Sequence, residues 1–261
     1  MTRVVALAAW LLAAPRLGMA QTLPPVAPPL VSDRPGFGES TEVVGRSVVQ
    51  FESGLTFARV NPQQRQFTAP ELLARIGIAR RFEVRVASDG YVAQSAETTA
   101  GSAWSHGHAD LELGAKLKLL DAARAGVDLA VIPFMSLPTA SEGFSTARYD
   151  PGFEIAALRR LPREFDLAAT FNTADATSDS GRAWQRELSV GLVHGLGGPV
   201  DAYWEADGQF DGGRCGCSFD AGVTLAAGAD GQFDVEAGHR LGGTGPEWFI
   251  AGGFVIRYRR H

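Results

Sequence analysis

Polar and apolar residues alternate along residues 108–120. Ala109, Leu111, Leu113, Ala115, Leu117 and Leu119 share one side of an extended chain, whereas Asp110, Glu112, Gly114, Lys116 and Lys118 share the other. A period of two predicts a β-strand, because at helical spacing the charges would surround the whole cylinder. The run of about eleven residues suits a tilted strand that crosses a bilayer, whereas most strands stop near five or six residues. We expect the leucine face to contact lipid and the charged face to line a barrel.

The same alternation recurs from residue 46 to residue 258 and predicts about twelve strands. The other strands are expected at residues 46–57, 72–78, 82–89, 127–137, 151–159, 164–172, 184–194, 200–210, 218–226, 232–239 and 248–258. An even number is typical of single-chain bacterial outer-membrane barrels. The predicted fold class is therefore all-β, a transmembrane antiparallel up-and-down β-barrel formed by residues 46–261. Pro133 removes a hydrogen-bond donor from one strand, so we expect a bulge there.

Connection lengths and aromatic positions favour the same architecture. Short connections at residues 80–81, 121–125, 160–163, 195–199 and 227–231 alternate with equal or longer ones at 61–66, 92–107, 138–150, 173–183, 211–217 and 240–246. Periplasmic turns are the short ones in such barrels, which places both termini in the periplasm. Aromatic residues on the apolar faces sit at predicted strand ends, as membrane-interface residues do. A soluble exported barrel or sandwich would alternate too, but would not explain these features.

The first 45 residues divide into two segments. Residues 1–20 combine Arg3, an apolar run over residues 4–14 and a small-residue site ending at Ala20, which predicts a cleaved signal peptide. An uncleaved anchor helix is the alternative, but Pro15 and Arg16 interrupt the run well short of the ~20 apolar residues a span requires. Residues 21–45 are first proline-rich and then polar, which predicts a periplasmic N-terminal extension or a plug for the lumen.

Composition excludes several classes of protein. The 261 residues carry a formal charge of −5 and are 45% hydrophobic, which is incompatible with a disordered chain. The sequence contains no basic patch of the kind that binds nucleic acid, so we do not expect a nucleic-acid partner. Cys215 and Cys217 are the only cysteines, so packing and closure rather than disulfides must stabilise the exported protein.

Several motifs carry a resemblance to a known family. They include Asp33-Arg34-Pro35, the stretches at residues 48–54, 70–77 and 114–118, and the Ile-Pro-Phe-Met-Ser-Leu-Pro run at 132–138. The chain resembles the "Putative MetA-pathway of phenol degradation" family. The resemblance implies an outer-membrane β-barrel, often called a transporter, in a setting of aromatic catabolism. Such barrels end on an aromatic residue recognised by the outer-membrane assembly machinery, whereas here Tyr258 is followed by three further residues.

The inward positions define the candidate lumen site. We select Glu71, Arg75, Glu83, Arg85, Asp110, Glu112, Lys116 and Lys118 as lumen or selectivity residues, and Asp33, Arg34 and Pro35 as plug residues. Further inward acids are expected at Glu52, Asp89, Glu154, Asp166, Glu187, Asp201, Glu205, Asp207, Asp220, Asp234 and Glu236. Twelve tilted strands enclose a backbone cylinder about 24 Å wide, which admits small solutes only. Excess acid favours a channel for cations or neutral solutes; alternatively the bases pair with the acids and fill the lumen.

No catalytic constellation stands out. His106 and His108 have no third strong metal ligand. Cys215 and Cys217 could hold a soft metal or form a strained disulfide, but decoration of a surface loop is the favoured interpretation. His194 and His239 lack a nucleophile partner nearby in the sequence, so we expect no enzyme activity, cofactor or metal site. The predicted function is an outer-membrane porin-like barrel or transporter for small solutes, with aromatic or hydrophobic compounds as candidates. The alternatives are a closed structural or ligand-binding barrel and, less favoured, a soluble periplasmic binding barrel. The expected partners are the outer-membrane bilayer, the assembly machinery and a small solute.

Overall fold

The computed structural model describes residues 29–98, 101–178, 181–211 and 214–259. The predicted signal peptide lies outside these residues. The described strands are β1 (Val48–Asn61), β2 (Gln64–Ala79), β3 (Phe82–Ser88), β4 (Tyr91–Thr98), β5 (Gly101–His108), β6 (Leu111–Leu120), β7 (Asp128–Leu137), β8 (Asp150–Leu161), β9 (Phe165–Ser178), β10 (Gly181–Gly197), β11 (Val200–Asp211), β12 (Arg214–Ala226), β13 (Gly231–Gly243) and β14 (Trp248–Arg259). A short helix, α1 (Ala122–Ala125), connects β6 to β7.

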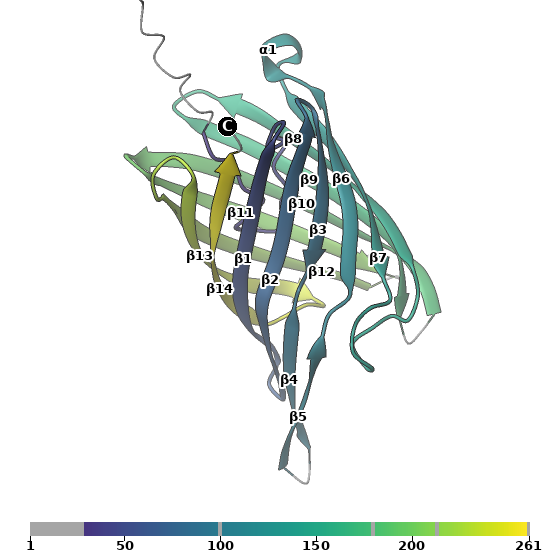
Figure 1. The fold of residues 1–261 in the computed structure, drawn as a ribbon. Helices are drawn as coiled ribbons and strands as arrows, with labels where there is room; N and C mark the ends of the chain where they lie inside the picture. Colours follow the sequence, from purple (N-terminus) through teal and green to yellow (C-terminus); the bar gives the residue numbers. More distant parts are fainter. Residues whose placement is uncertain (1–28, 99–100, 179–180, 212–213, 260–261) are drawn as a thin grey trace, which may run out of the picture.

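These segments form twelve barrel strands, because β3 with β4 and β5 with β6 are the two halves of single long strands. One side of β2 pairs with β3 near its end and with β4 near its start. The next strand repeats this division, since β6 pairs with β3 and β5 pairs with β4. All pairings are antiparallel, and β1 closes the barrel by pairing with both β14 and β2 (Figure 1). The predicted fold and strand number are confirmed.

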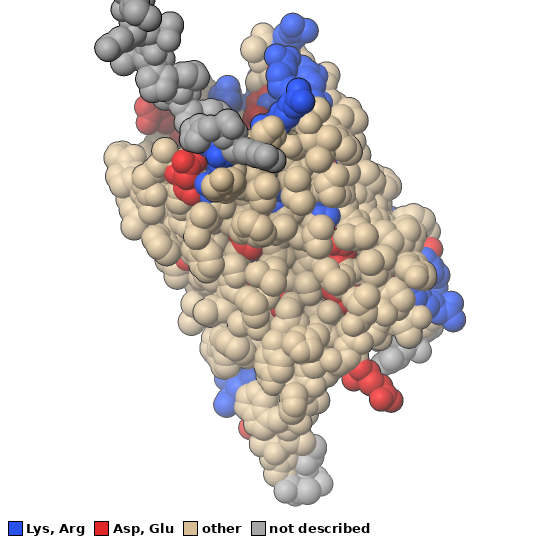
Figure 2. Space-filling model, viewed as in Figure 1, with Lys and Arg blue, Asp and Glu red and all other residues tan. Residues whose placement is uncertain are grey.

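The two faces of the sheet differ as the alternation predicts. On β6, Leu113 and Leu117 are 46% and 40% exposed on the outside, whereas Lys116 between them is fully buried. The largest fully buried side chains are mostly polar or charged, led by Arg75 and Lys116. Figure 2 shows an outer surface almost free of charge along the middle of the barrel, with charged side chains gathered at both ends. This arrangement suits a wall between lipid and a polar interior.

The strands at one end are longer than predicted. The expected connection at residues 92–107 is a β-hairpin, β4–β5, that extends beyond the rest of the barrel (Figure 1). The expected loops around residues 173–183 and 211–217 are likewise extensions of β9, β10, β11 and β12. These predictions were wrong because the sequence there is polar on both faces, as a strand that has left the bilayer can be. The expected bulge also differs: the register shifts between Lys118 and Leu120, while Pro133 pairs regularly with Phe153.

The opposite end carries the short turns, α1 and the chain's C-terminal strand end (Figure 1). The first described residues lie at this end too, since Arg257 Nη1 donates a hydrogen bond to the Pro29 carbonyl oxygen at 3.0 Å. The chain then enters the barrel, as the next subsection describes. Among the described residues, no helix is long and apolar enough to cross a bilayer.

Candidate functional site

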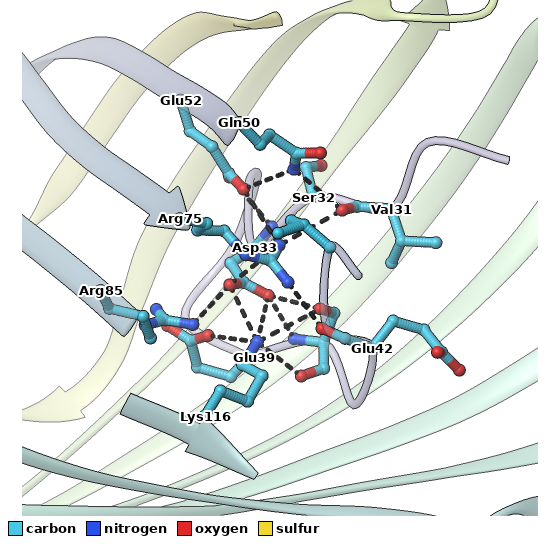
Figure 3. Close-up of polar contacts among 12 residues, drawn as sticks. Val31, Ser32, Asp33, Glu39, Glu42, Gln50, Glu52, Arg75, Arg85 and Lys116 are labelled. Carbon is cyan, nitrogen blue, oxygen red and sulfur yellow. Dashed lines mark hydrogen bonds and ion pairs between the residues drawn. The ribbon is translucent and has the colours of Figure 1, made fainter. Parts of the chain in front are cut away.

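Residues 31–44, here called the inner segment, lie inside the barrel. Their polar groups contact inward-facing side chains from strands on opposite walls, including Glu52 of β1, Lys116 of β6 and Glu205 of β11. Sequence favours this path, because the polar and glycine-rich composition of the segment offers backbone donors and no apolar face. Figure 3 shows the segment among the side chains of β1, β2, β3 and β6.

Asp33 is the centre of this contact. Its carboxylate accepts hydrogen bonds from Lys116 Nζ at 2.8 and 2.9 Å and from Arg85 Nη1 at 2.6 Å. Arg75 Nη1 lies 3.1 Å from the same carboxylate. We call Arg75, Arg85 and Lys116 the basic cluster; these side chains are at most 8% exposed. Three cations from three strands thus share one carboxylate from the inner segment (Figure 3).

Further carboxylates complete the charge balance around the basic cluster. Arg75 Nε binds Glu83 at 2.8 Å and its Nη1 binds Glu52 at 3.1 Å, while Arg85 Nη2 binds Glu39 at 2.7 Å. Burial alone would raise the pKa of Asp33, but the nearby positive charges of the basic cluster hold that pKa well below its ordinary value. Asp33 is therefore ionised at neutral pH.

Arg34 occupies a cradle built from two glycines. Its guanidinium binds Glu71 at 2.8 Å and Asp234 at 3.4 Å. Gly54 of β1 and Gly253 of β14 are paired directly opposite each other beneath it. A Cβ atom on Gly54 would lie 2.3 Å from Arg34 Cζ, and one on Gly253 would lie 2.5 Å from Arg34 Nε. Only glycine at these positions leaves room for the guanidinium against the barrel wall.

The other selected residues occupy different places. Pro35 lines a cavity beside the inner segment. Lys118 binds Glu42 of the inner segment and lies 3.1 Å from Asp128, near the short turns. Asp110 accepts hydrogen bonds from the backbone of Thr139 and Ala140, so it holds a loop at the opposite end. Glu112 forms an ion pair with no described residue. The structure thus brings Arg75, Glu83, Arg85 and Lys116 together around Asp33, and Glu71 to Arg34.

The far wall of the lumen is acidic. It consists of five inward carboxylates on β10–β13, here called the acidic wall: Glu187, Glu205, Asp207, Asp220 and Glu236. Glu205 and Asp220 are direct cross-strand neighbours. Asp220 is fully buried, and neither carboxylate oxygen has a hydrogen-bond partner among the described residues. No described lysine or arginine forms an ion pair with any of the five. Arg34, which is nearby, binds Asp234 instead.

The inner segment touches this wall only through neutral donors. The backbone N–H groups of Gly36 and Phe37 donate to Glu236 at 2.9 Å and Glu205 at 2.7 Å. Gly36 has a φ of +95°, which favours glycine, and a Cβ there would lie 2.6 Å from Glu205 Oε2. The two sides of the lumen therefore hold the same segment by different chemistry.

Cavities lie on both sides of this contact. One of about 280 Å³ is lined by Ser32, Gly38, Asp166 and Glu205 and faces the short-turn side. Another, of about 50 Å³, is lined by Phe37, Asp207 and His239, and a third of about 320 Å³ is lined by Glu187, Gln185 and Gln209. Glu205 lines the first of these cavities and Phe37 lines the second. Two of these cavities therefore border the acidic wall extensively, and a further one of about 290 Å³ lies away from it, lined by Glu42, Gln50 and Arg257.

The acidic wall was not among the selected site residues, although the signal was present in the sequence. Each member occupies an inward position, and the inward residues of the predicted strands from 184 to 239 include seven acids, of which only Asp234 forms an ion pair with a described lysine or arginine. The other candidate motifs form no compact site. His106 and His108 flank the Tyr91 ring, with centroids 5.9 Å away, and Cys215 and Cys217 are exposed and free. His194 stacks on Phe165 at 4.1 Å.

A closed antiparallel barrel with an apolar exterior and a charged interior has the architecture of outer-membrane β-barrels. The chain belongs to the family described as "Putative MetA-pathway of phenol degradation", whose model matches residues 32–258. No curated protein sequence matches the chain.

Solved outer-membrane proteins share this fold at low sequence identity. An outer-membrane channel from Pseudomonas putida F1 superposes with a TM-score of 0.63 and 13% identity, covering 86% of this chain and 99% of that one. The KdgM porin gives a TM-score of 0.50 at 11% identity, with 82% and 99% of the two chains covered. The NanC porin gives 0.50 at 9% identity, with 80% and 98% covered. These similarities establish a channel- or porin-like barrel fold.

Proposed function

We propose that the protein is an outer-membrane channel for small solutes in which the inner segment acts as a plug. In this proposal residues 1–20 direct export and the barrel lies in the outer membrane. The observation that carries the proposal is the unequal attachment of the inner segment. Ion pairs hold it to the basic cluster on one side, whereas backbone N–H groups alone join it to the acidic wall on the other.

The expected path for solutes runs along the acidic wall. The cavities of about 280 and 320 Å³ border this wall, and a shift of the segment around Phe37 would join the spaces on its two sides. Five carboxylates without a basic partner favour cationic or neutral polar solutes over anions, because rings or rows of acidic side chains select cations in pores. The family description adds aromatic catabolism as the setting, so small aromatic compounds are the first solutes to test.

Conductance in planar bilayers tests this function. The refolded chain without residues 1–20 should show small or infrequent current steps, and removal of residues 21–45 should produce larger, longer-lived steps. Removal of residues 21–28 alone is the matched control, because it leaves the inner segment and its ion pairs intact. If neither the full chain nor the 21–45 deletion conducts, the barrel is instead a closed structural or ligand-binding protein, which the filled basic half of the lumen would favour.

A further inference from the structure

Arginines gather on one part of the rim at the short-turn end. Arg80 and Arg81 form the β2–β3 turn, Arg124 lies in α1, and Arg159, Arg160 and Arg163 lie at the end of β8 and in the β8–β9 turn. These turns are neighbours, because β3 pairs with β6 and β7 pairs with β8. Figure 2 shows blue side chains gathered at the end of the barrel where Figure 1 places α1.

The other short turns have a different composition. Residues 198–199, between β10 and β11, and residues 227–230, between β12 and β13, contain no lysine or arginine, and the second turn contains Asp230. Asp230 already accepts ion pairs from Arg257 and Arg259. These two turns therefore lack the arginines that the β2–β3 and β8–β9 turns carry, on a chain whose overall formal charge is −5.

Most arginines of this sector lack a partner within the protein. Arg81 binds Asp121, and Arg160 lies 4.0 Å from Asp128. The remaining four are exposed and form no ion pair with any described residue: Arg80, Arg124, Arg159 and Arg163, here called the arginine rim. Four guanidinium groups without an ion-pair partner among the described residues therefore lie on neighbouring turns and strand ends.

The register of two members places them at the edge of the lipid-facing surface. Arg159 follows Phe153 and Ile155 on the outward side of β8, and both are 38% exposed. Arg80 follows Ile78, which is 50% exposed, at the end of β2. An arginine in such a position packs its aliphatic stem on apolar surface and extends its charge into the headgroup layer.

We propose that the arginine rim binds the phosphate groups of anionic phospholipids in the leaflet that surrounds the short-turn end. The planar guanidinium group binds phosphate oxygens through two parallel hydrogen bonds, and its charge is permanent. Neighbouring strands lie about 4.8 Å apart, so the rim spans several headgroups rather than one. This binding does not depend on whether the barrel conducts.

Spin-labelled lipids test the proposal in reconstituted vesicles of phosphatidylcholine with a minority of phosphatidylglycerol. Electron paramagnetic resonance gives the association of labelled phosphatidylglycerol with the protein relative to labelled phosphatidylcholine. The variant R80Q/R124Q/R159Q should weaken the preference by about fivefold for each arginine that contacts a phosphate. High salt should weaken the preference of the unmodified protein, because exposed charges are screened.

The matched control is R65Q/R148Q/R186Q, which removes three exposed and unpaired arginines from the other end of the barrel. This control should keep the preference. The proposal is overturned if the unmodified protein shows no preference for phosphatidylglycerol, or if both triple variants lose it equally. Heat-modifiable migration on gels verifies that each variant has folded. If R80Q/R124Q/R159Q does not fold, R124Q carries the test, because Arg124 lies outside the strands.

Discussion

The two sides of the lumen have the same backbone architecture and opposite electrostatics. On β2, β3 and β6, the basic cluster is buried and every member binds Asp33 of the inner segment. On β10–β13, the five carboxylates of the acidic wall have no basic partner among the described residues, and only Asp234 of β13 forms an ion pair, with Arg34. The chain has enough arginine and lysine to neutralise more of these acids, yet four arginines lie unpaired on the rim.

This difference shows where the interior can rearrange. Removing a charged segment from buried partners leaves uncompensated charges in a poorly solvated site, which is costly. Breaking a backbone hydrogen bond to a carboxylate costs less, provided that water replaces the donor. The basic half therefore fixes the inner segment, and the acidic half is the side on which solutes and water can compete with it.

The most severe test of this comparison is Asp33→Asn. The substitution keeps the shape of the side chain but leaves three buried cations without their shared carboxylate, which should destabilise the bound inner segment by about 3–5 kcal/mol. We expect a large increase in the open fraction of single-channel recordings. The control is Asp110→Asn, which alters a loop contact at the other end of the barrel. An open fraction unchanged by Asp33→Asn would show that the basic cluster does not hold the segment.

A second test alters the cradle of Arg34 without removing any charge. Gly54→Ala puts a methyl group where the guanidinium lies and should cost about 1–3 kcal/mol through overpacking. Gly191→Ala is the matched control, because its Cβ atom would lie at an ordinary van der Waals distance of 3.6 Å from its nearest neighbour, the Trp204 carbonyl oxygen. Only the first variant should make residues 31–44 accessible to a thiol reagent, read from a cysteine placed at Ser40 in a chain whose exposed Cys215 and Cys217 are both replaced by serine. Equal labelling of the two variants would contradict the cradle.

A third test concerns the acidic wall, where the expected change is in selectivity rather than in plug attachment. Glu205→Gln with Asp220→Asn removes two like charges that lie directly opposite each other, so stability should change by less than about 1 kcal/mol. Reversal potentials in a salt gradient should show a lower permeability of cations relative to anions. Glu97→Gln, on the exposed β4–β5 hairpin, should leave the ratio unchanged. An unaltered ratio in the double variant would place the path elsewhere.

The sequence was sufficient for the fold wherever one face of a strand meets lipid. Leu111, Leu113 and Leu117 alternate with Glu112 and Lys116, and a slip of one residue would turn charges toward the bilayer. The β4–β5 hairpin was missed because both of its faces are polar, so it has no alternation to detect. Outside the bilayer, the strands stay paired because they continue strands that are already paired within the barrel. The local sequence alone does not contain this information.

The candidate site was only partly predictable for a related reason. Alternation identifies which residues point inward but does not say which inward residues face each other across the lumen. Arg34 and Asp234 are 200 positions apart, and their contact depends on barrel closure between β1 and β14. Two interpretations of the charges, a filled lumen and an acidic channel, remained open for that reason. The structure shows paired charges on one wall of the lumen and acids without an ion-pair partner among the described residues on the other.

The smallest expected effect is the response to mild acid. Because the pKa of Asp33 lies well below 3.8 in the folded protein, its ion pairs stabilise the bound segment above the unfolded-state pKa. This stability is lost only as the pH falls through the lower, folded-state pKa. Lowering the pH from 7 to about 4 should therefore not release the segment, and the open fraction of single-channel recordings should stay constant over this range. Asp33→Asn should show a high open fraction at every pH. Release of the segment between pH 5 and 6 would mean that Asp33 is not held ionised by the basic cluster.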